Sequence, residues 1–193
     1  ALDRRTLVES TYGGVGELST SYVGPNISGR DPNLESYFPT QNVARAKQLL
    51  AEAGYANGFK TSIFCNNSDP QRMQFCEAFQ AQMAPVGIGV ELKFMDAVTW
   101  NTLATTGKTA LNIYGLTAST GEAGRNLFRF LPGANEWAVF SWTNQEYNDL
   151  VNKALSTVDE KARNELYYKC QQMLMKNFIL LPMCVKNSVA AGQ

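Results

Sequence analysis

The chain has 193 residues, of which 45% are hydrophobic, and its 17 basic residues balance 17 acidic ones. This length and composition predict a globular domain with a substantial core. Because the charges balance, the composition does not indicate a basic surface of the kind that binds nucleic acid or an anionic membrane. The longest apolar stretch, FILLPMCV at 178–185, is much shorter than the ~18 apolar residues that span a bilayer.

The sequence contains no histidine. Histidine is the commonest general base and the commonest zinc ligand, so its absence excludes Ser-His and Cys-His nucleophilic arrangements and most zinc sites. Three acids near predicted loops, Asp96, Glu122 and Glu136, show no pairing of the kind that glycoside hydrolysis needs. We therefore expect no enzymatic activity, no metal and no cofactor, with a carboxylate-based, glycosidase-like hydrolase as the alternative.

The four cysteines are scattered and form no C-x-x-C motif: Cys65, Cys76, Cys170 and Cys184. Each lies in an apolar stretch, which favours buried thiols that act as small hydrophobic side chains. A Cys65–Cys76 disulfide is the alternative.

The sequence predicts a helix over 41–53, where QNVARAKQLLAEA repeats apolar residues at helical spacing and Gly54 marks the end. After a glycine-containing turn, KTSIFCN at 60–66 is rich in β-forming residues and predicts a strand.

A second helix is expected over 70–84, with Asp69 or Ser68 as its cap and Pro70 in its first turn. Apolar residues then alternate over 88–94, which is typical of a strand. Because only a helix separates the two strands, they are most simply parallel and joined by a right-handed crossover.

A short helix around AVTWNTLAT and a strand at 110–116 lead into the loop of NIYGLTASTGEAGRNLF at 112–128. A strand that opens onto a glycine-rich turn and a helix is a frequent ligand site in α/β proteins. Gly121 and Gly124 do not have the spacing of a dinucleotide fingerprint and no lysine follows them, so we expect no nucleotide. An ordinary surface turn is the alternative.

The last third is predicted to be mainly helical. Thr143 and Glu146 form a capping box at the start of a helix over 143–157. A second helix follows over 160–176, and the apolar segment 179–185 predicts a strand in the same mixed sheet as the others.

Four stretches, spread over nearly the whole chain, follow one family pattern. ALDR at 1–4 is similar to AIDR, ARAKQLLAEAGYANGF at 44–59 to an AKxLLxEAGY helix and turn, APVGIGVEL at 84–92 to L-x-x-I-G-I-x-V-x-L, and 143–183 to a helical tail. With these residues the chain resembles the C-terminal lobe of the extracellular solute-binding proteins of family five, the peptide/nickel-type receptors of ABC importers.

The resemblance implies an α/β fold, a periplasmic-binding-protein-like (type II) lobe with a mixed sheet flanked by helices, over residues 1–193. Family members close two lobes on a ligand, so this chain would be a fragment without the N-terminal lobe and the final return strands. Its start, ALDRRTLVES, has neither an initiator methionine nor a leader, as expected for an excised piece.

The resemblance also implies a cellular role. The intact protein would be extracytoplasmic, in the periplasm or anchored at the cell surface as a lipoprotein. It would bind a peptide or another small solute, hand it to an ABC permease in the membrane, act as a monomer and bind no nucleic acid.

In peptide-binding members a GW-x-x-D strand end faces the cleft, where its aspartate pairs with the ammonium group of the peptide. Aligned on Gly115, this chain has Leu116 in place of the aromatic residue and Ser119 in place of the aspartate. A neutral hydroxyl cannot form the charge-assisted bond, worth about 1.5–3 kcal/mol. Glu122 is the nearby acid that could replace it, or it is a turn residue. We expect Gly115, Thr117 and Ser119 to line an open concavity for an extended ligand.

Two tryptophans have two interpretations each. Trp100 is expected either in the core or against the ligand, and Trp142 either as a hydrophobic staple for the helix after it or in the cleft. Aromatic side chains in a cleft suit sugars as well as peptide side chains, so an oligosaccharide is the alternative to the peptide ligand.

Overall fold

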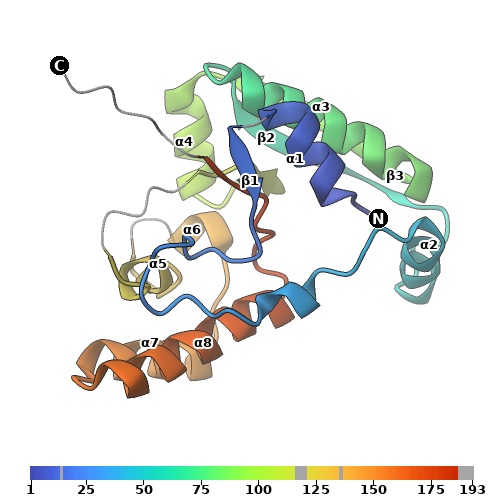
Figure 1. The fold of residues 1–193 in the computed structure, drawn as a ribbon. Coiled ribbons are helices and arrows are strands. Elements are labelled where there is room, and N and C mark those ends of the chain that lie inside the picture. Colours follow the sequence, from blue (N-terminus) through green and yellow to red (C-terminus); the bar gives the residue numbers. More distant parts are fainter. Residues whose placement is uncertain (14, 116–120, 135–136, 187–193) are drawn as a thin grey trace.

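In the computed structural model, which describes residues 1–13, 15–115, 121–134 and 137–186, a parallel sheet and a layer of helices lie at opposite ends of the molecule (Figure 1). The chain supplies the three strands of this sheet from residues 59–112 and most of the helical layer from its last third. The predicted α/β class is confirmed.

The sheet has three strands in the order β3-β2-β4. Its central strand, β2 (Phe59–Asn66), pairs in parallel with β3 (Ile88–Met95) over its whole length and with β4 (Leu111–Asn112) at Ile63 and Phe64. The two strands expected at 60–66 and 88–94 therefore share a sheet and run parallel, as predicted.

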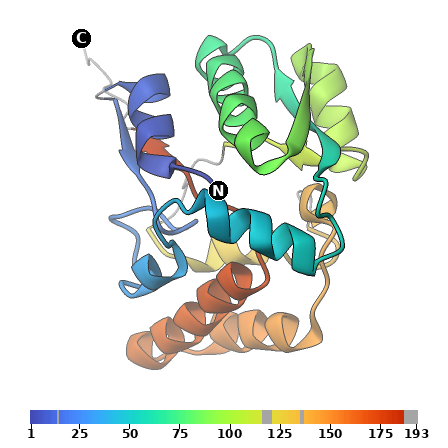
Figure 2. The same cartoon turned by 90° about the vertical axis from the view of Figure 1, so that its right-hand side faces the viewer.

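Two helices cover this sheet, α3 (Pro70–Met83) and α4 (Ala97–Thr105), and they lie on either side of it (Figure 2). The side chains between β2, β3 and α3 form one core cluster, which contains Ile63, Cys65, Cys76, Met83 and Val90. Burial of such apolar surface is the main force that holds a helix on a sheet.

Both helices begin at an aspartate, because a carboxylate satisfies backbone N–H groups that have no partner inside the helix. The Asp69 side chain accepts the N–H of Arg72, and Pro70 occupies the first turn, as the sequence predicts. Asp96 accepts the N–H groups of Val98 and Thr99. Hydrogen bonds from the Thr99 hydroxyl and N–H lower the pKa of Asp96.

The remaining helices precede the sheet or form the helical layer: α1 (Arg4–Tyr12), α2 (Val43–Glu52), α5 (Gly124–Phe128), α6 (Trp137–Phe140), α7 (Gln145–Ser156) and α8 (Glu160–Lys176), with short 3-10 helices η1 (Leu34–Tyr37) and η2 (Ala84–Val86). Among the described residues, no helix combines the length and the apolar character needed to cross a bilayer.

The predicted capping box at Thr143 is wrong. The cap lies one residue later than expected, at Asn144, whose side-chain oxygen accepts the N–H of Tyr147, and the helix itself starts at Gln145. Asparagine caps helices as well as serine or threonine does, and the sequence offers both residues side by side.

The helix α2 forms as predicted, but none of its residues is buried. Leu49, on the apolar stripe, is 49% exposed, and Tyr55 just after the helix is 52% exposed. The amphipathic pattern therefore predicted the helix correctly. It did not predict burial, because no residue of α2 is buried within the described structure.

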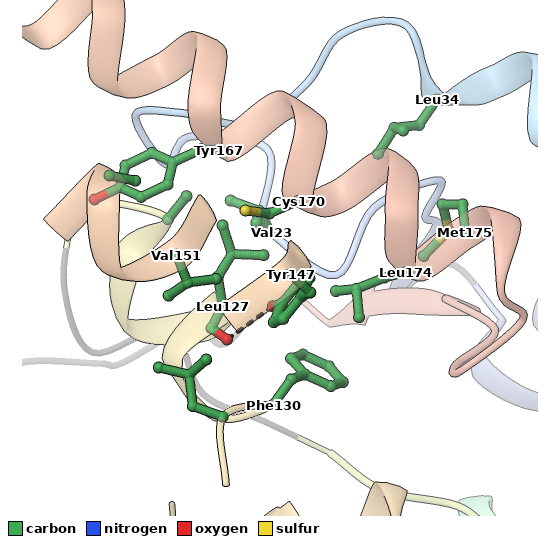
Figure 3. Close-up of a cluster of buried hydrophobic side chains, with 13 residues drawn as sticks. Val23, Leu34, Leu127, Phe130, Tyr147, Val151, Tyr167, Cys170, Leu174 and Met175 are labelled. Carbon is green, nitrogen blue, oxygen red and sulfur yellow. Dashed lines mark hydrogen bonds between the residues drawn. The ribbon is translucent and has the colours of Figure 1, made fainter. Parts of the chain in front are cut away.

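The core of the helical layer lies between α5, α7 and α8 (Figure 3). Tyr147 is fully buried, and its hydroxyl donates a hydrogen bond of 2.8 Å to the carbonyl oxygen of Leu127. Burial raises the pKa of Tyr147 well above its ordinary value, so this hydroxyl stays a donor.

The Tyr147 hydroxyl gives a testable effect on stability. The variant Tyr147→Phe removes the donor, while the Leu127 carbonyl keeps the N–H of Phe130. We expect the free energy of unfolding to fall by about 1 kcal/mol, the typical worth of one hydrogen bond. Chemical unfolding measures it, with the exposed Tyr55→Phe as the control. Equal stabilities of the two variants would contradict this role of the hydroxyl.

Side-chain hydrogen bonds hold a long loop over 19–31 against α8: Gln172 donates to Asp31 and Ser28 donates to Glu160, and the buried Gln171 makes the most bonds. Gln171 is 1% exposed. Its Nε2 donates to the Gly29 carbonyl at 2.7 Å, and its Oε1 accepts the Ser21 hydroxyl at 2.9 Å and the N–H of Asp31 at 3.2 Å. The loop therefore replaces regular secondary structure with side-chain hydrogen bonds.

The predicted strand at 179–185 was placed in the wrong sheet. The strand that forms, β5 (Cys184–Lys186), pairs antiparallel with β1 (Gly16–Leu18) in a separate two-stranded sheet. It starts only after Pro182, which has no N–H to donate to a ladder. The Pro182 carbonyl instead accepts a hydrogen bond of 2.5 Å from the guanidinium of Arg4 on α1.

Candidate ligand-binding site

The carboxyl ends of β2, β3 and β4 meet at one edge of the sheet, because all three strands run parallel. Hydrogen bonds tie the segments after them together: the N–H of Asn67 donates to the Met95 carbonyl at 2.8 Å, and the N–H of Ile113 donates to the Phe64 carbonyl at 3.3 Å. Open α/β sheets bind ligands at this edge. Gly115, two residues beyond Ile113, belongs to it.

Gly115 lies directly against an arginine. A Cβ atom at this position would be 2.7 Å from Nη2 of Arg72, so the absence of a side chain lets the guanidinium approach the backbone. Arg72 is held by Asp69, with 3.0 Å between its Nε and Oδ2 of the carboxylate. Both side chains are about a quarter exposed, at 26% and 27%.

A second cation lies at the same carboxylate. Nζ of Lys186 is 4.0 Å from Oδ2 of Asp69 and donates a hydrogen bond of 2.8 Å to Oε1 of Gln71. Two positive side chains thus share one negative one beside Gly115. This local excess of positive charge favours an anionic group.

Trp100 lies in the core under this edge. It is 8% exposed and stacks on Tyr114, with ring centroids 5.5 Å apart and planes at 28°. Because Tyr114 precedes Gly115, this pair supports the segment that carries the glycine. Offset stacking of this kind is worth about 0.5–1.5 kcal/mol beyond the buried area.

Glu122 lies in the helical layer and has a cationic partner. Its carboxylate accepts a hydrogen bond from Nε of Arg163 on α8, and this ion pair raises the pKa of Arg163. Arg163 also donates to the carbonyls of Thr157 and Val158 at 2.9 and 2.8 Å. Any ligand ammonium that used Glu122 would have to compete with this arginine.

Trp142 packs on the helix that follows it. Its ring meets Tyr147 of α7 edge to face, with centroids 5.1 Å apart and planes at 67°. It belongs to the partly buried rim of the core of the helical layer. With Asn144 as the cap, Trp142 lies two residues before the cap rather than one, so the contact packs the entering chain on the helix without the spacing of a hydrophobic staple.

Thr117 and Ser119, together with Leu116, lie outside the described residues. The structure therefore brings Gly115 and Trp100 to the same edge of the sheet and places Glu122 and Trp142 against α8 and α7.

Sequence reasoning missed three residues of this edge, namely Arg72, Lys186 and Tyr114. Arg72 could have been noticed, because it lies in the first turn of the helix that follows a central strand, where α/β proteins bind anions. Lys186 could not have been noticed, because its strand was expected in the sheet of β2 and β3.

Within the described ranges, no group of three or more Cys, Asp or Glu side chains is arranged to hold a metal ion.

Comparison with known proteins identifies relatives over most of the chain. The chain is 27% identical over 179 residues to heme-binding protein A of Haemophilus influenzae, covering 89% of this chain and 32% of that protein. It is 29% identical over 203 residues to the glutathione-binding protein GsiB of Escherichia coli K12, covering 99% of this chain and 38% of that protein. The chain thus spans about a third of the length of these relatives.

Solved structures share the fold. The ABC transporter-associated periplasmic binding protein DppA from Helicobacter pylori, in complex with the peptide STSA, matches with a TM-score of 0.84 at 25% identity, over 95% of this chain and 36% of that one. A dipeptide binding protein from Pseudoalteromonas sp. SM9913, in complex with Met-Leu, matches with a TM-score of 0.88 at 23% identity, over 96% of this chain and 38% of that one.

The family described as bacterial extracellular solute-binding proteins, family 5 Middle, matches residues 1–137. This match covers more than half of the chain and agrees with the relatives and with the shared fold. The resemblance inferred from the sequence is confirmed: the chain belongs to the family 5 bacterial extracellular solute-binding proteins.

Proposed function

We propose that this chain is the C-terminal lobe of the substrate-binding component of an ABC importer. The intact protein captures an extracellular solute, foremost a peptide, in the cleft between two lobes and delivers it to the permease. The observation that carries this proposal is the exposed backbone of Gly115 beside the guanidinium of Arg72, at the edge where open α/β sheets bind ligands. Structures of the same fold hold peptides.

The charges of this edge favour one end of a peptide. Arg72 and Lys186 outweigh Asp69, so a carboxylate is a better ligand here than an ammonium group. An arginine can hold a carboxylate through two parallel hydrogen bonds, which adds geometric specificity. We assign the C-terminal carboxylate of the peptide to Arg72 and the extended main chain to the backbone at Gly115, in the manner of an added β-strand.

The other end of the peptide has weaker support. Ser119 cannot neutralise an ammonium group, and Glu122 already pairs with Arg163. In this proposal Thr117 and Ser119 line the path of the ligand, and Trp100 supports the Gly115 segment through its stacking on Tyr114. Glu122 and Trp142 stabilise the helical layer.

The hydrolase alternative finds less support. It needs two carboxyl groups facing each other across a pocket, about 5–10 Å apart. Asp96 is engaged as the cap of α4, Glu122 is bound to Arg163, and Glu136 lies outside the described residues. The relatives named above are binding proteins, and we propose that this protein likewise performs no chemistry.

Membership of a family of extracellular solute-binding proteins supports a location of the intact protein outside the cytoplasm. We propose that it works as a monomer, in the periplasm or anchored at the cell surface as a lipoprotein. Ligand contacts in both lobes would then stabilise the closed form over the open one. The difference in ligand affinity between the two forms would set how far the equilibrium shifts toward the closed form.

Calorimetry on the intact two-lobed receptor tests this function with three forms of one suitable peptide. N-acetylation is expected to change the affinity by less than about tenfold, or ~1.4 kcal/mol. C-terminal amidation is expected to weaken binding by roughly 10- to 100-fold, because it removes a charge-assisted bond to Arg72.

Two outcomes would contradict the proposal. A loss of several hundredfold on acetylation alone would mean that an acid clamps the ammonium group, with Glu122 as the first residue to examine. Binding of oligosaccharides in a thermal-shift screen, with no peptide raising the melting temperature, would replace the peptide ligand by a sugar.

A further inference from the structure

Lys186, at the end of β5, places a positive charge beside the ion pair of Asp69 and Arg72. Its Nζ lies 4.0 Å from Oδ2 of Asp69 and 4.6 Å from the centre of the Tyr12 ring, and it donates a hydrogen bond of 2.8 Å to Oε1 of Gln71. Contacts from α1 and α3 thus hold the ammonium group, although the side chain is 39% exposed. A charge that is held in place acts on its neighbours at a defined distance.

The packing of β5 explains why this charge lies near Gly115. Ile113 and Cys184 both pack on the cluster of buried side chains that joins α1 to α3. Gly115 follows Ile113 by two residues, and Lys186 follows Cys184 by two residues. One hydrophobic cluster therefore positions both the backbone of the candidate site and the strand that carries the ammonium group.

The acid on the paired strand β1 does not face Lys186. Glu17 lies opposite Val185, whereas Gly16 lies opposite Lys186. Successive side chains of a strand point to opposite faces of a sheet. Glu17 and Lys186 therefore point to opposite faces of the two-stranded sheet, and within the described ranges the carboxylate at ion-pair distance from Lys186 is that of Asp69.

Asp69 occupies only one side of the Arg72 guanidinium. Its Oδ2 lies 3.0 Å from Nε, whereas Nη2 is the atom that lies against Gly115. A ligand carboxylate bound at Nη2 would therefore share the guanidinium with the carboxylate of Asp69. Two negative groups at this range repel each other, and a nearby cation offsets the repulsion.

We propose that Lys186 determines the preference of the candidate site for a carboxylate, and that it acts through Asp69, whose charge it cancels. Asp69 itself is needed for structure, because it caps α3 and holds Arg72. With Lys186 the three side chains carry one positive charge in excess, and a single ligand carboxylate neutralises it. Without Lys186 the pair of Arg72 and Asp69 would already be neutral, so the site would lose part of its attraction for an anion. This inference rests on the proposed function, since it concerns the carboxylate that we assign to Arg72.

Calorimetry on the intact receptor tests the role of Lys186. The probes are the peptides Ser-Thr-Ser-Ala and Met-Leu, which are bound in the structures of the same fold, each in its free form and with an amidated C-terminus. Lys186→Gln is expected to weaken binding of the free forms by roughly three- to tenfold and to change that of the amidated forms by less than about twofold. A purely structural role would weaken free and amidated forms by the same factor, and this result would overturn the proposal.

A charge swap separates the charge from the side chain that carries it. Gln71 and Lys186 are hydrogen-bonded partners, so the double variant Gln71→Lys with Lys186→Gln keeps one ammonium group near Asp69 and leaves Asp69 and Arg72 unchanged. Affinity for the free peptides is expected to return to within about threefold of the wild type. A double variant that binds as weakly as Lys186→Gln alone would contradict the proposal.

Two single variants complete the test. Lys186→Arg keeps the charge and should bind the free peptides like the wild type. Lys60→Gln removes an exposed lysine at the amino end of β2, away from the candidate site, and should also bind like the wild type. If the wild type binds neither peptide, the proposed peptide ligand is contradicted. If the wild type binds them and Lys186→Gln binds equally well, only the role of Lys186 is overturned.

Discussion

Replacing Gln171 by leucine is expected to lower the free energy of unfolding by about 3–5 kcal/mol. The variant Gln171→Leu removes the partners of the Gly29 carbonyl, the Asp31 N–H and the Ser21 hydroxyl. These groups stay buried, and each unsatisfied buried group costs about 1–3 kcal/mol. Leucine has a similar volume, so the loss reports the hydrogen bonds rather than a cavity.

Urea unfolding of the intact protein measures this loss. The control is Gln145→Leu on α7, because Gln145 is exposed and contacts only the exposed Asp149 through its side chain in the described hydrogen bonds. This control is expected to change the stability by less than about 0.5 kcal/mol. A cost below ~1 kcal/mol for Gln171→Leu would show that the loop over 19–31 is held by other contacts.

The second large effect concerns ligand binding. The variant Arg72→Gln is expected to weaken peptide binding by roughly 10- to 100-fold, because a hydrogen bond to a charged group is worth about 1.5–3 kcal/mol. Its effect on stability should be small, since the ion pair that it breaks with Asp69 is partly exposed. Calorimetry with the free peptide measures the affinity, and thermal unfolding checks the fold.

The matched control for this variant is Arg5→Gln. Arg5 is also a helical arginine with an acidic neighbour, Glu9, but its side chain is 73% exposed and the ion pair is long at 3.8 Å. Its affinity for peptide should equal that of the wild type. If Arg72→Gln also binds with wild-type affinity, the carboxylate of the peptide does not lie on Arg72.

Local patterns in the sequence were enough for most of the fold. Apolar residues over 88–94 recur with the two-residue period of a strand, and those of α8 recur with the 3.6-residue period of a helix. Each period predicts its element without any tertiary contact. Asp69 and Pro70 mark the start of α3 through backbone chemistry that needs no tertiary contact.

What failed depends on distant parts of the chain. The strand at β5 has no local signal for its partner, and the pairing with β1 joins residues near opposite ends of the chain. The same holds for the burial of a predicted helix: α2 has a clear apolar stripe, yet nothing in its sequence says whether another element covers it.

The candidate site was predictable only in part. The family resemblance pointed to Gly115, because that strand end has a recognisable pattern. Arg72 was missed although its place in the first turn of the helix after a central strand is a usable signal, and it is the packing of α3 on β2 that brings its guanidinium to the backbone at Gly115. Lys186 arrives from the far end of the chain through the pairing of β5.

Hydrogen–deuterium exchange of the intact receptor, with and without a saturating peptide, tests the central claim most directly. Backbone amides that bind a ligand or are covered by it exchange more slowly. The account predicts protection of the peptides that cover 66–72 and 111–115, at the carboxyl edge of the sheet, and unchanged exchange in the buried centres of α7 and α8. Binding that left both sheet-edge segments unprotected, or that protected only the helical layer, would contradict it.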